Sequence, residues 1–335
     1  MDNFTVLVTA DAFRASAAEA ERPLVEAGAR ILYPTRMGPL TAEELLPWLQ
    51  QADAVVAAND PYIRSVLDAC PRLRVIARWG TGYDQVDVAA CTQAGVVACN
   101  APGQNVQAVA DYVFLMLLAL ARRLPHQLHV MQTGGWEEVR GVELFQKTLG
   151  IVGLGAIGKA VVRRARGFEC RILAYDPYLD PAAARDLGVE LTDLETLFAG
   201  SDYITLHATL TRETTGLVSA PLLAQMKPTA FLVNAARGPI VNESALLEAL
   251  TAGRIAGAAL DAYCTEPLPG DHPLRCLPNC LCTPHSAFNT EETAAAVNRL
   301  VAQQILAVRR GDVPAGALNP DVFDTPAFVA RASPR

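Results

Sequence analysis

The chain has 335 residues, of which 51% are hydrophobic and 19% charged. One domain usually takes ~100–200 residues, so this length predicts two domains or one large α/β unit, and the composition excludes a largely disordered chain. The 28 basic and 35 acidic residues give a net charge of −7, and no segment gathers the basic run typical of nucleic-acid or polybasic membrane binding. We therefore expect a small molecule as the partner, with no nucleic acid and no membrane.

The hydrophobic segments also argue against insertion into a membrane. The longest uncharged apolar run covers residues 112–121, well short of the ~18 residues that a spanning helix needs. At the amino end, Asp2 and Asp11 flank Thr5-Val6-Leu7-Val8, an order that predicts a strand rather than a signal peptide. We expect the protein in the cytoplasm.

Eight cysteines are present without a Cys-x-x-Cys pair, and in a long cytosolic chain most are expected to be small buried hydrophobic residues. One cluster of soft ligands stands out, and it comprises His272, Cys276, Cys280, Cys282 and His285. Cys282 alternates with Leu281 in a strand-like run, which points neighbours to opposite faces. We therefore predict no metal site.

From residue 5 to 100, short β-rich runs alternate with helix-length stretches, which predicts a wound α/β domain with a mainly parallel sheet. The expected strands are Val6–Thr9, Arg30–Leu32, Ala54–Ala57, Val75–Arg78 and Val96–Ala98. The expected helices are Ala15–Ala27, Ala42–Gln50, Tyr62–Cys70 and Val86–Ala94. Asn100-Ala101-Pro102-Gly103 breaks this pattern and is a candidate boundary, after which a long apolar helix is expected over Val106–Arg122.

A second α/β series follows a polar arm, Arg123 to Gln146, which shows little periodicity. The expected strands are Thr148–Val152, Arg171–Tyr175, Tyr203–Leu206, Phe231–Asn234, Gly257–Leu260 and Cys280–Thr283. A helix is then expected over Glu291–Arg309. The tail from Pro314 to Arg335 either covers a domain or frays.

A glycine-rich loop opens the second series. Gly153-Leu154-Gly155-Ala156-Ile157-Gly158 follows the strand Leu149–Val152 and opens a helix over Ile157–Arg166. In such a loop the first glycine permits the tight turn, the second admits a pyrophosphate, and the third lets the helix pack on the strand. The helix amino terminus then binds the phosphates. This context predicts a dinucleotide site rather than an ordinary turn.

The next strand, Ile172–Tyr175, ends in Asp176. Its position matches the acidic residue expected ~20 residues beyond the loop, where a carboxylate accepts hydrogen bonds from the adenosine ribose. Its charge would repel the extra phosphate of NADP, and Pro177 and Tyr178 follow it instead of an arginine. We therefore predict NAD as the cofactor.

Five ordered motifs resemble those of the D-isomer-specific 2-hydroxyacid dehydrogenases, most closely their 3-phosphoglycerate dehydrogenase branch. They are Arg78-Trp79-Gly80-Thr81-Gly82-Tyr83-Asp84, the loop Gly153–Gly158, Asn234-Ala235-Ala236-Arg237-Gly238, Ala259-Leu260-Asp261 with Glu266-Pro267, and Thr283-Pro284-His285. The resemblance implies two doubly wound domains, with a Rossmann NAD-binding domain over 103–289 inserted in a flavodoxin-like substrate domain made of 1–102 and 290–335. It also implies a homodimer or dimer of dimers, joined through the helix and arm 106–146.

The catalytic residues follow from the chemistry of hydride transfer at carbon 2 of a hydroxy acid, which needs a proton-transfer group and a cation for the carboxylate. Arg237 follows the predicted strand Phe231–Asn234, at the edge of a parallel sheet where ligands bind. His285 follows another strand and is predicted to transfer the proton. Glu266 would pair with His285 and favour its imidazolium form.

Other positions come from the resemblance alone. It implies that Arg78 and the backbone of Thr81 and Gly82 bind the substrate, and that Asp261 bonds the nicotinamide carboxamide. The remaining cofactor contacts that it implies are Gly153, Gly155, Ala156, Ile157, Gly158, Asp176, Ala208 and Ala235.

The sequence departs from phosphoglycerate dehydrogenases where their phosphate-binding cations stand. An arginine commonly follows the strand matching Ala54–Val56, and this chain has Ala57-Ala58-Asn59-Asp60 there. A basic residue of the arm is replaced by Glu138. Because a phosphate dianion needs several charge-assisted contacts, we expect an unphosphorylated D-2-hydroxy acid. The end of the chain near residue 335 also leads us to expect no feedback control by serine.

Two alternatives remain open at this point. One is D-3-phosphoglycerate dehydrogenase proper, with Arg78 and its neighbours forming the phosphate site. The other is an NAD-sensing, corepressor-like scaffold, because such relatives retain the same arginine, glutamate and histidine.

Overall fold

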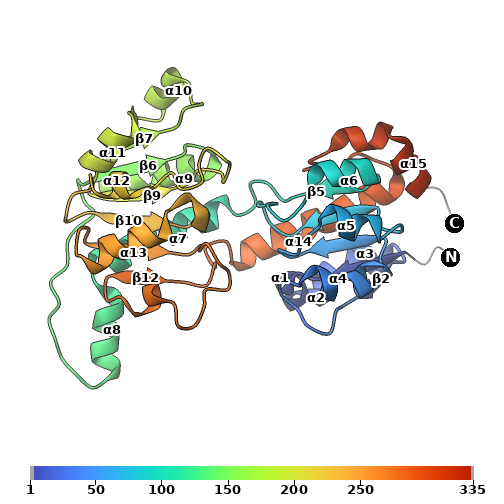
Figure 1. Ribbon diagram of the computed structural model, residues 1–335, viewed down its shortest axis with the longest axis horizontal. Helices are drawn as coiled ribbons and strands as arrows, with labels where there is room; N and C mark the ends of the chain where they lie inside the picture. The colour runs from blue at the N-terminus through green and yellow to red at the C-terminus, as the bar shows by residue number, and fades with distance from the viewer. Residues whose placement is uncertain (1–3, 333–335) are drawn as a thin grey trace. The chain divides into compact units, whose positions relative to one another are not determined.

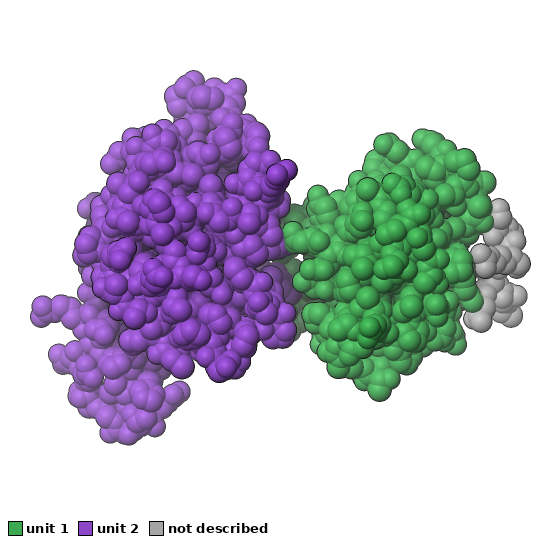
Figure 2. Space-filling view, in the orientation of Figure 1, with its two compact units in different colours: residues 1–105, 289–335 green, residues 106–288 purple. Residues whose placement is uncertain are grey.

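The computed structural model describes residues 4–332; Asp2 and the last three residues of the predicted tail lie outside that range. The chain divides into two compact units, which Figure 2 colours separately. Unit 1 joins residues up to 105 with those from 289 onward, and unit 2 comprises residues 106–288. Each unit is built on its own parallel sheet.

The sheet of unit 1 has five strands in the order β2-β1-β3-β4-β5, all paired in parallel. The strands are β1 (Thr5–Val8), β2 (Arg30–Leu32), β3 (Ala54–Ala57), β4 (Val75–Arg78) and β5 (Val97–Cys99). β1, β3 and β5 are buried throughout, as expected of strands covered by helices on both faces. The order 2-1-3-4-5 is that of a flavodoxin-like domain, so the predicted fold class is confirmed for this unit.

The prediction of one helix over Ala15–Ala27 is wrong. The structure has three short helices there, α1 (Asp11–Ala15), α2 (Ala17–Ala20) and α3 (Arg22–Glu26). Pro23 lies in the first turn of α3, where its missing N–H is harmless, whereas inside one continuous helix its ring would clash with the preceding turn. Pro23 therefore favours the start of a new helix here, which the hydrophobic pattern does not indicate.

The other predicted helices of unit 1 are present, three of them with shorter ends and the helix from Glu291 one residue longer, and the tail adds a helix that was not predicted. They are α4 (Ala42–Leu49), α5 (Arg64–Asp68), α6 (Val88–Ala94), α14 (Glu291–Arg310) and α15 (Pro326–Ala332), with a 3₁₀ turn η4 (Pro320–Asp324). Thr41 and Glu44 form a capping box that begins α4, which satisfies two otherwise unpaired backbone donors. Gly95 ends α6 in the left-handed conformation, with φ 72°.

The segment from residue 314 to 332 covers unit 1 rather than fraying. Ala317 bridges to Cys99 at the edge of the sheet, and the side chain of Asn319 accepts the N–H of Ala98 at 2.8 Å. A Cβ at Gly95 would lie 2.4 Å from the backbone of Ala327 in α15. This segment therefore packs tightly against α6 and β5.

The sheet of unit 2 has seven strands in the order β12-β11-β10-β9-β6-β7-β8, again all parallel (Figure 1). The strands are β6 (Thr148–Val152), β7 (Arg171–Tyr175), β8 (Glu190–Leu191), β9 (Tyr203–Leu206), β10 (Phe231–Asn234), β11 (Gly257–Leu260) and β12 (Cys280–Cys282). Numbered within the unit, this is the 3-2-1-4-5-6 order of a Rossmann domain with one further strand. The two-residue strand β8 was not predicted, because it is too short to show a pattern.

Helices cover both faces of the unit 2 sheet, and alternate residues along its strands face two separate cores. The helices are α7 (Val106–Ala121), α8 (Leu124–Gln132), α9 (Ala156–Ala165), α10 (Pro181–Asp186), α11 (Leu194–Gly200), α12 (Ala220–Leu223) and α13 (Glu243–Thr251), with 3₁₀ turns η1 (Arg166–Phe168), η2 (Gly238–Ile240) and η3 (Pro273–Cys276). α7 packs with α9 on one face.

The expectation of an irregular arm from Arg123 is wrong for its first part, which forms the helix α8. None of its residues is buried, and hydrophobic periodicity arises only where a helix buries one face. In Figure 1, α8 projects away from the rest of its unit. Within residues 4–332, no helix is long and apolar enough to cross a membrane.

Candidate active site

The glycine loop joins β6 to α9 at the carboxyl end of the unit 2 sheet. Gly153 has φ 94°, and a Cβ there would lie 2.8 Å from the N atom of Ala208, just beyond β9. A Cβ at Gly158 would lie 2.2 Å from the carbonyl oxygen of Gly153. Both positions therefore require glycine, the first for the turn and the third for helix packing.

Gly155, the middle glycine, differs from its two neighbours because a Cβ there would meet no atom within 4 Å. It begins α9 as the N-cap residue, so the space in front of it adjoins the amino terminus of a helix. Backbone N–H groups and the helix dipole favour an anion at such a place. These residues fit the pyrophosphate of a dinucleotide.

Asp176 follows β7 and contacts the glycine loop directly. Its Oδ2 accepts the N–H of Leu154 at 2.8 Å, and its Oδ1 accepts the N–H of Tyr178 at 3.0 Å. Each carboxylate oxygen can still accept a second hydrogen bond. The side chain is therefore fixed beside the loop and retains acceptor capacity for ribose hydroxyls.

The other predicted cofactor contacts lie on the same edge of the sheet. Ala156 and Ile157 begin α9, and Ala208 and Ala235 follow β9 and β10. His207, which the sequence did not single out as a site residue, lies beside Gly153. Burial lowers the pKa of His207 to about 3, so its imidazole is neutral at pH 7 and bonds the hydroxyl of Thr205 at 3.1 Å.

Arg237 follows β10 in a turn that Asn234 holds in place. The buried Asn234 side chain donates to the carbonyl of Arg237 at 2.9 Å and accepts the N–H of Ala236 at 3.1 Å. The guanidinium of Arg237 donates to the carbonyl of Ala236 at 2.8 Å. The turn is thus fixed by side-chain bonds within four residues.

Glu266 and His285 form an ion pair in which Nδ1 of the imidazole lies 2.8 Å from Oε2 of the carboxylate. The second oxygen, Oε1, accepts the N–H of Tyr263 at 3.0 Å. Burial opposes ionisation of Glu266, but the bond and charge of His285, the N–H of Tyr263 and the charge of Arg237 outweigh it and lower the pKa of Glu266. The carboxylate is therefore ionised at neutral pH and orients the imidazole through Nδ1.

Asp261 fixes the loop that carries His285. It is 1% exposed and accepts the hydroxyl of Thr283 at 2.6 Å and the N–H groups of Ser286 and Ala287, each at 2.8 Å. His285 between them has φ 52°, a left-handed conformation that a non-glycine residue adopts at a cost. The buried carboxylate offsets this cost. The sequence identified Asp261, but not this bonding.

The predicted substrate residues of unit 1 lie at the end of β4, where Arg78 is its last residue and Thr81 and Gly82 follow. Asn100 donates to the carbonyl of Thr81 at 2.7 Å, and the hydroxyl of Thr81 donates to the carbonyl of Ala101 at 3.1 Å. Gly82 is the next residue, and Arg78 donates from its guanidinium to the carbonyl of Trp79. These residues form a braced turn at the carboxyl end of the sheet.

The positions where the sequence lacks family cations lie in different surroundings. Ala57 is fully buried at the end of β3, whereas Asn59 is exposed. Asp60 is fully buried and accepts bonds from Thr9, the N–H of Leu40 and the hydroxyl of Tyr62, and burial raises its pKa despite them. Glu138 is exposed beyond α8.

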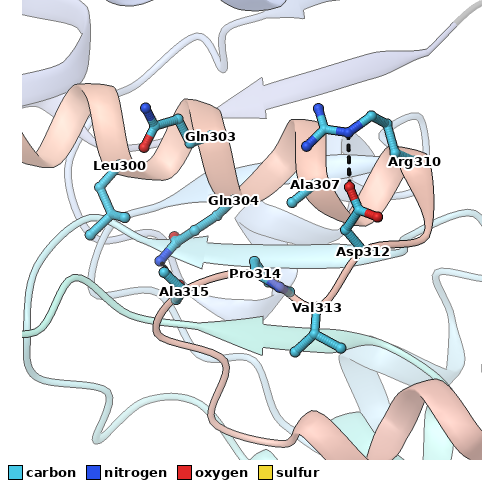
Figure 3. Close-up of a pocket in the computed structure, with 9 residues that line it drawn as sticks. All are labelled: Leu300, Gln303, Gln304, Ala307, Arg310, Asp312, Val313, Pro314 and Ala315. Atoms are coloured by element: carbon cyan, nitrogen blue, oxygen red, sulfur yellow. Dashed lines mark hydrogen bonds and ion pairs between the residues drawn. The ribbon is translucent and has the colours of Figure 1, made fainter.

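None of the predicted site residues lines the hollow in unit 1. This hollow, of about 400 Å³, lies between α14 and residues 312–315, beside the ion pair of Arg310 and Asp312 (Figure 3). Over the described part of the chain, no three His, Cys, Asp or Glu side chains are grouped to hold a metal ion. In the cysteine-rich segment, His272 instead pairs with Glu243 at 3.3 Å.

Comparison with known proteins places this architecture in one family. The chain is 41% identical over 284 residues to D-3-phosphoglycerate dehydrogenase of Methanocaldococcus jannaschii, covering 84% of this chain and 54% of that protein. It is 38% identical over 291 residues to glyoxylate reductase of Korarchaeum cryptofilum, covering 85% and 88%. It thus spans about half the length of the first relative and most of the second.

A solved structure agrees with these relatives. The apo-structure of D-lactate dehydrogenase from Escherichia coli superposes with a TM-score of 0.83 at 30% identity, covering 94% of this chain and all of that one. Residues 114–287 match the NAD binding domain of the D-isomer specific 2-hydroxyacid dehydrogenases. The chain therefore belongs to the D-isomer specific 2-hydroxyacid dehydrogenase family.

Proposed function

We propose that this protein is an NAD-dependent oxidoreductase that interconverts a small, unphosphorylated D-2-hydroxy acid and its 2-keto acid. The observation that carries the proposal is the ion pair of Glu266 and His285, in which Oε2 and Nδ1 lie 2.8 Å apart. The charge of Arg237 also lowers the pKa of Glu266. An oriented imidazole beside a cation is what proton transfer to a keto acid requires. Similarity to glyoxylate reductase over most of its length supports the same class of reaction.

In the direction of reduction, His285 donates a proton to the keto oxygen. Glu266 holds Nδ1, so Nε2 is the nitrogen left for the substrate, and the carboxylate stabilises the imidazolium that must form before each transfer. NAD, when bound, supplies or accepts the hydride at carbon 2. Gly153, Gly155, Gly158 and Asp176 would hold it, with Asp261 at the nicotinamide end.

We assign substrate binding to Arg237 in unit 2 and to Arg78, Thr81 and Gly82 in unit 1. Arg237 supplies a planar, permanently charged fork that matches a carboxylate, and the backbone of Thr81 and Gly82 supplies N–H donors. Unit 1 is accordingly the substrate domain and unit 2 the cofactor domain.

We infer an unphosphorylated substrate from the side chains at the positions where the family's phosphate-binding cations are missing. The end of β3 offers the neutral, exposed Asn59 and the buried acid Asp60, and Glu138 adds a second acid. A phosphate dianion would need cations at such positions. The competing candidate is 3-phosphoglycerate, which the 41% identity to the Methanocaldococcus jannaschii enzyme favours.

We also propose that the protein works as a homodimer or a dimer of dimers in the cytoplasm. The apolar surface that supports this lies on α7, on α8 and just beyond α8, and it comprises Leu115, Leu118, Leu124, Leu128, Met131 and Trp136. Trp136 is 85% exposed, and contiguous exposed apolar side chains mark interaction sites. The cysteines are all unpaired, as in proteins of reducing compartments.

The test is a panel of 2-keto acids with NADH, read by the absorbance of NADH. We expect turnover of glyoxylate, hydroxypyruvate or pyruvate, and a loss of about 10²–10⁴-fold in kcat for His285→Ala. His129→Ala, which removes an exposed imidazole of α8, is the matched control and should retain activity. Full turnover by His285→Ala would refute the mechanism, and greater activity on phosphohydroxypyruvate, the keto acid of 3-phosphoglycerate, would refute the substrate class.

A further inference from the structure

Two thiols lie side by side on the last strand of the unit 2 sheet. Cys280 and Cys282 both belong to β12, where alternate residues share a face, and their Sγ atoms are 3.8 Å apart. Both side chains are partly buried against the same core, while Leu281 between them packs on the opposite one. The alternation of the strand thus brings two of the eight cysteines together.

The surroundings distinguish this pair from the other buried cysteines. Burial raises the pKa of Cys91 and of Cys99 to about 12 each, which keeps those thiols protonated and unreactive. The hydrogen bond from Cys280 lowers the pKa of Cys282, against the effect of burial, and the hydroxyl of Tyr263 and the charge of Arg275 add to this lowering. Of the two thiols, Cys282 is therefore the one that ionises more readily.

We propose that Cys280 and Cys282 form a reactive dithiol that a hydroperoxide oxidises to an intramolecular disulfide. The Cys282 thiolate attacks one peroxide oxygen, the O–O bond breaks, and the leaving alkoxide or hydroxide takes up a proton. Cys282 is then a sulfenic acid. Cys280 attacks that sulfur, the S–O bond breaks, and water leaves with the remaining proton. Two thiols lose two electrons in total, and the peroxide gains them.

The position of β12 allows the two sulfurs to approach. A disulfide requires about 2.05 Å between the sulfurs, so the strand must adjust from the present 3.8 Å. β12 ends the strand order and pairs with β11 alone, and it spans only Cys280–Cys282. Because this strand is short and has one neighbouring strand, it can bend while disturbing backbone hydrogen bonds on one side only.

Tyr263 connects the dithiol to the candidate active site. Its hydroxyl favours the ionised form of Cys282 and lies 2.8 Å and 2.9 Å from the carbonyl oxygens of Leu260 and Thr283. Thr283 is two residues before His285. Its N–H donates to Glu266 at 3.0 Å. We therefore infer that disulfide formation displaces the Glu266–His285 pair and lowers turnover, a consequence that rests on the proposed function.

The chemistry is tested by mass spectrometry on the full chain. The protein is treated with hydrogen peroxide, alkylated and digested with trypsin. In the peptide 276–299 we expect Cys280 and Cys282 to escape alkylation and the peptide to be about 2 mass units lighter than the same peptide with both as free thiols. Dithiothreitol should reverse this change. That peptide also contains Cys276, which is exposed, so the Cys276→Ser variant leaves only the proposed pair. Cys280→Ser and Cys282→Ser should each abolish the disulfide.

Several outcomes would overturn the dithiol. These are free thiols at both positions after peroxide, a disulfide to Cys264 or Cys276 instead, or sulfonic acid that forms on Cys282 without a disulfide. If either serine variant fails to fold, the Cys276→Ser protein alone still decides, because its peptide holds no third cysteine.

Activity tests the coupling separately. We expect peroxide to lower the turnover of wild type and Cys276→Ser by about tenfold or more, since small displacements of catalytic groups are costly, and dithiothreitol to restore it. Cys280→Ser should keep its activity in peroxide. Unchanged turnover in the fully disulfide-bonded protein would refute the coupling. The mass measurement needs no turnover, so failure of the proposed function and failure of the dithiol are distinguishable.

Discussion

Gly238 lies against Tyr263 so closely that a Cβ at residue 238 would be 1.9 Å from the carbonyl carbon of Tyr263. The residue before Gly238 is Arg237, and Tyr263 donates its N–H to Glu266. This single close approach therefore sets the spacing between the cation and the acid of the candidate site. Two loops that follow different strands meet there through their backbones, without an intervening side chain.

Gly238→Ala should consequently destabilise the protein by at least about 2 kcal/mol and reduce activity, because backbone on both sides must shift. The matched control is Gly270→Ala, since a Cβ at that exposed glycine would meet nothing within 4 Å, and its effect should stay within about 0.5 kcal/mol. Urea unfolding of the two variants measures the difference. Equal stability would show that the loops are not in this contact.

Glu266→Gln removes the charge of the carboxylate while it keeps the side-chain shape. We expect kcat at pH 7 to fall by about 10–100-fold, because the imidazolium loses its counter-ion. If Glu266→Gln kept the kcat of the wild type, this would contradict the role assigned to Glu266.

The same variant has a signature in stability. The folded-state pKa of Glu266 is below its ordinary value of 4.5, so its stabilising effect is present above about pH 4.5 and is lost as the pH falls through the lowered pKa. The variant should be less stable than wild type at pH 7 and approach it in stability as the pH falls below the lowered pKa of Glu266. A constant difference across this range would show that the carboxylate is not stabilised by its ionisation.

Arg237→Lys keeps the positive charge and removes the planar fork. A carboxylate bound by two parallel N–H bonds should lose affinity, so we expect kcat/KM for the best 2-keto acid to fall by about 10–100-fold. NADH affinity, measured by fluorescence titration, serves as the internal control and should stay unchanged. A parallel loss of NADH binding would indicate that Arg237 acts on the fold of the loop instead.

Asp176→Asn removes the charge that we expect to repel the phosphate of NADP. The amide oxygen can still accept the N–H of Leu154, which Asp176 bonds at 2.8 Å, so the loop should remain in place. Wild type should bind NADH more tightly than NADPH, and the variant should narrow that preference by about tenfold. Tighter binding of NADPH by the wild type would refute the cofactor preference.

The sequence predicts the parallel strands well because buried strands read as apolar runs, such as Ala54–Ala57 and Phe231–Asn234, whose bounds agree with the structure. Residues that follow such strands meet at one edge of the sheet, so the pairing of Glu266 with His285 agrees with their predicted roles. The resemblance to the family also identifies Asp261, although the sequence does not indicate its hydrogen bonds.

What the sequence conceals depends on contacts between distant segments. α8 buries none of its residues, and so it leaves no periodic pattern. The close approach of Gly238 to Tyr263 joins residues of different loops, and no local signal marks it. Two of the bonds that hold Asp60 likewise come from residues distant in the chain, Thr9 just beyond β1 and Leu40 before α4.

The burial of residues at the end of β3 determines which substitution can test substrate specificity. The sequence marks Ala57 as the place where an arginine is missing, but its side chain is fully buried in the core of unit 1. Ala57→Arg would place a charge there at a cost of several kcal/mol, roughly 3–5, so we expect it to lower stability.

The exposed Asn59, two residues further on, is the position that can carry a new cation. Asn59→Arg should leave stability within about 0.5 kcal/mol and improve KM for a phosphorylated substrate relative to its unphosphorylated analogue, because an arginine fork matches a phosphate. Asn59→Gln is the control, since it lengthens the side chain without a charge. The measurement is the ratio of kcat/KM for phosphohydroxypyruvate to that for hydroxypyruvate. A ratio that stays the same in Asn59→Arg and Asn59→Gln would show that the missing cation at the end of β3 does not decide the substrate.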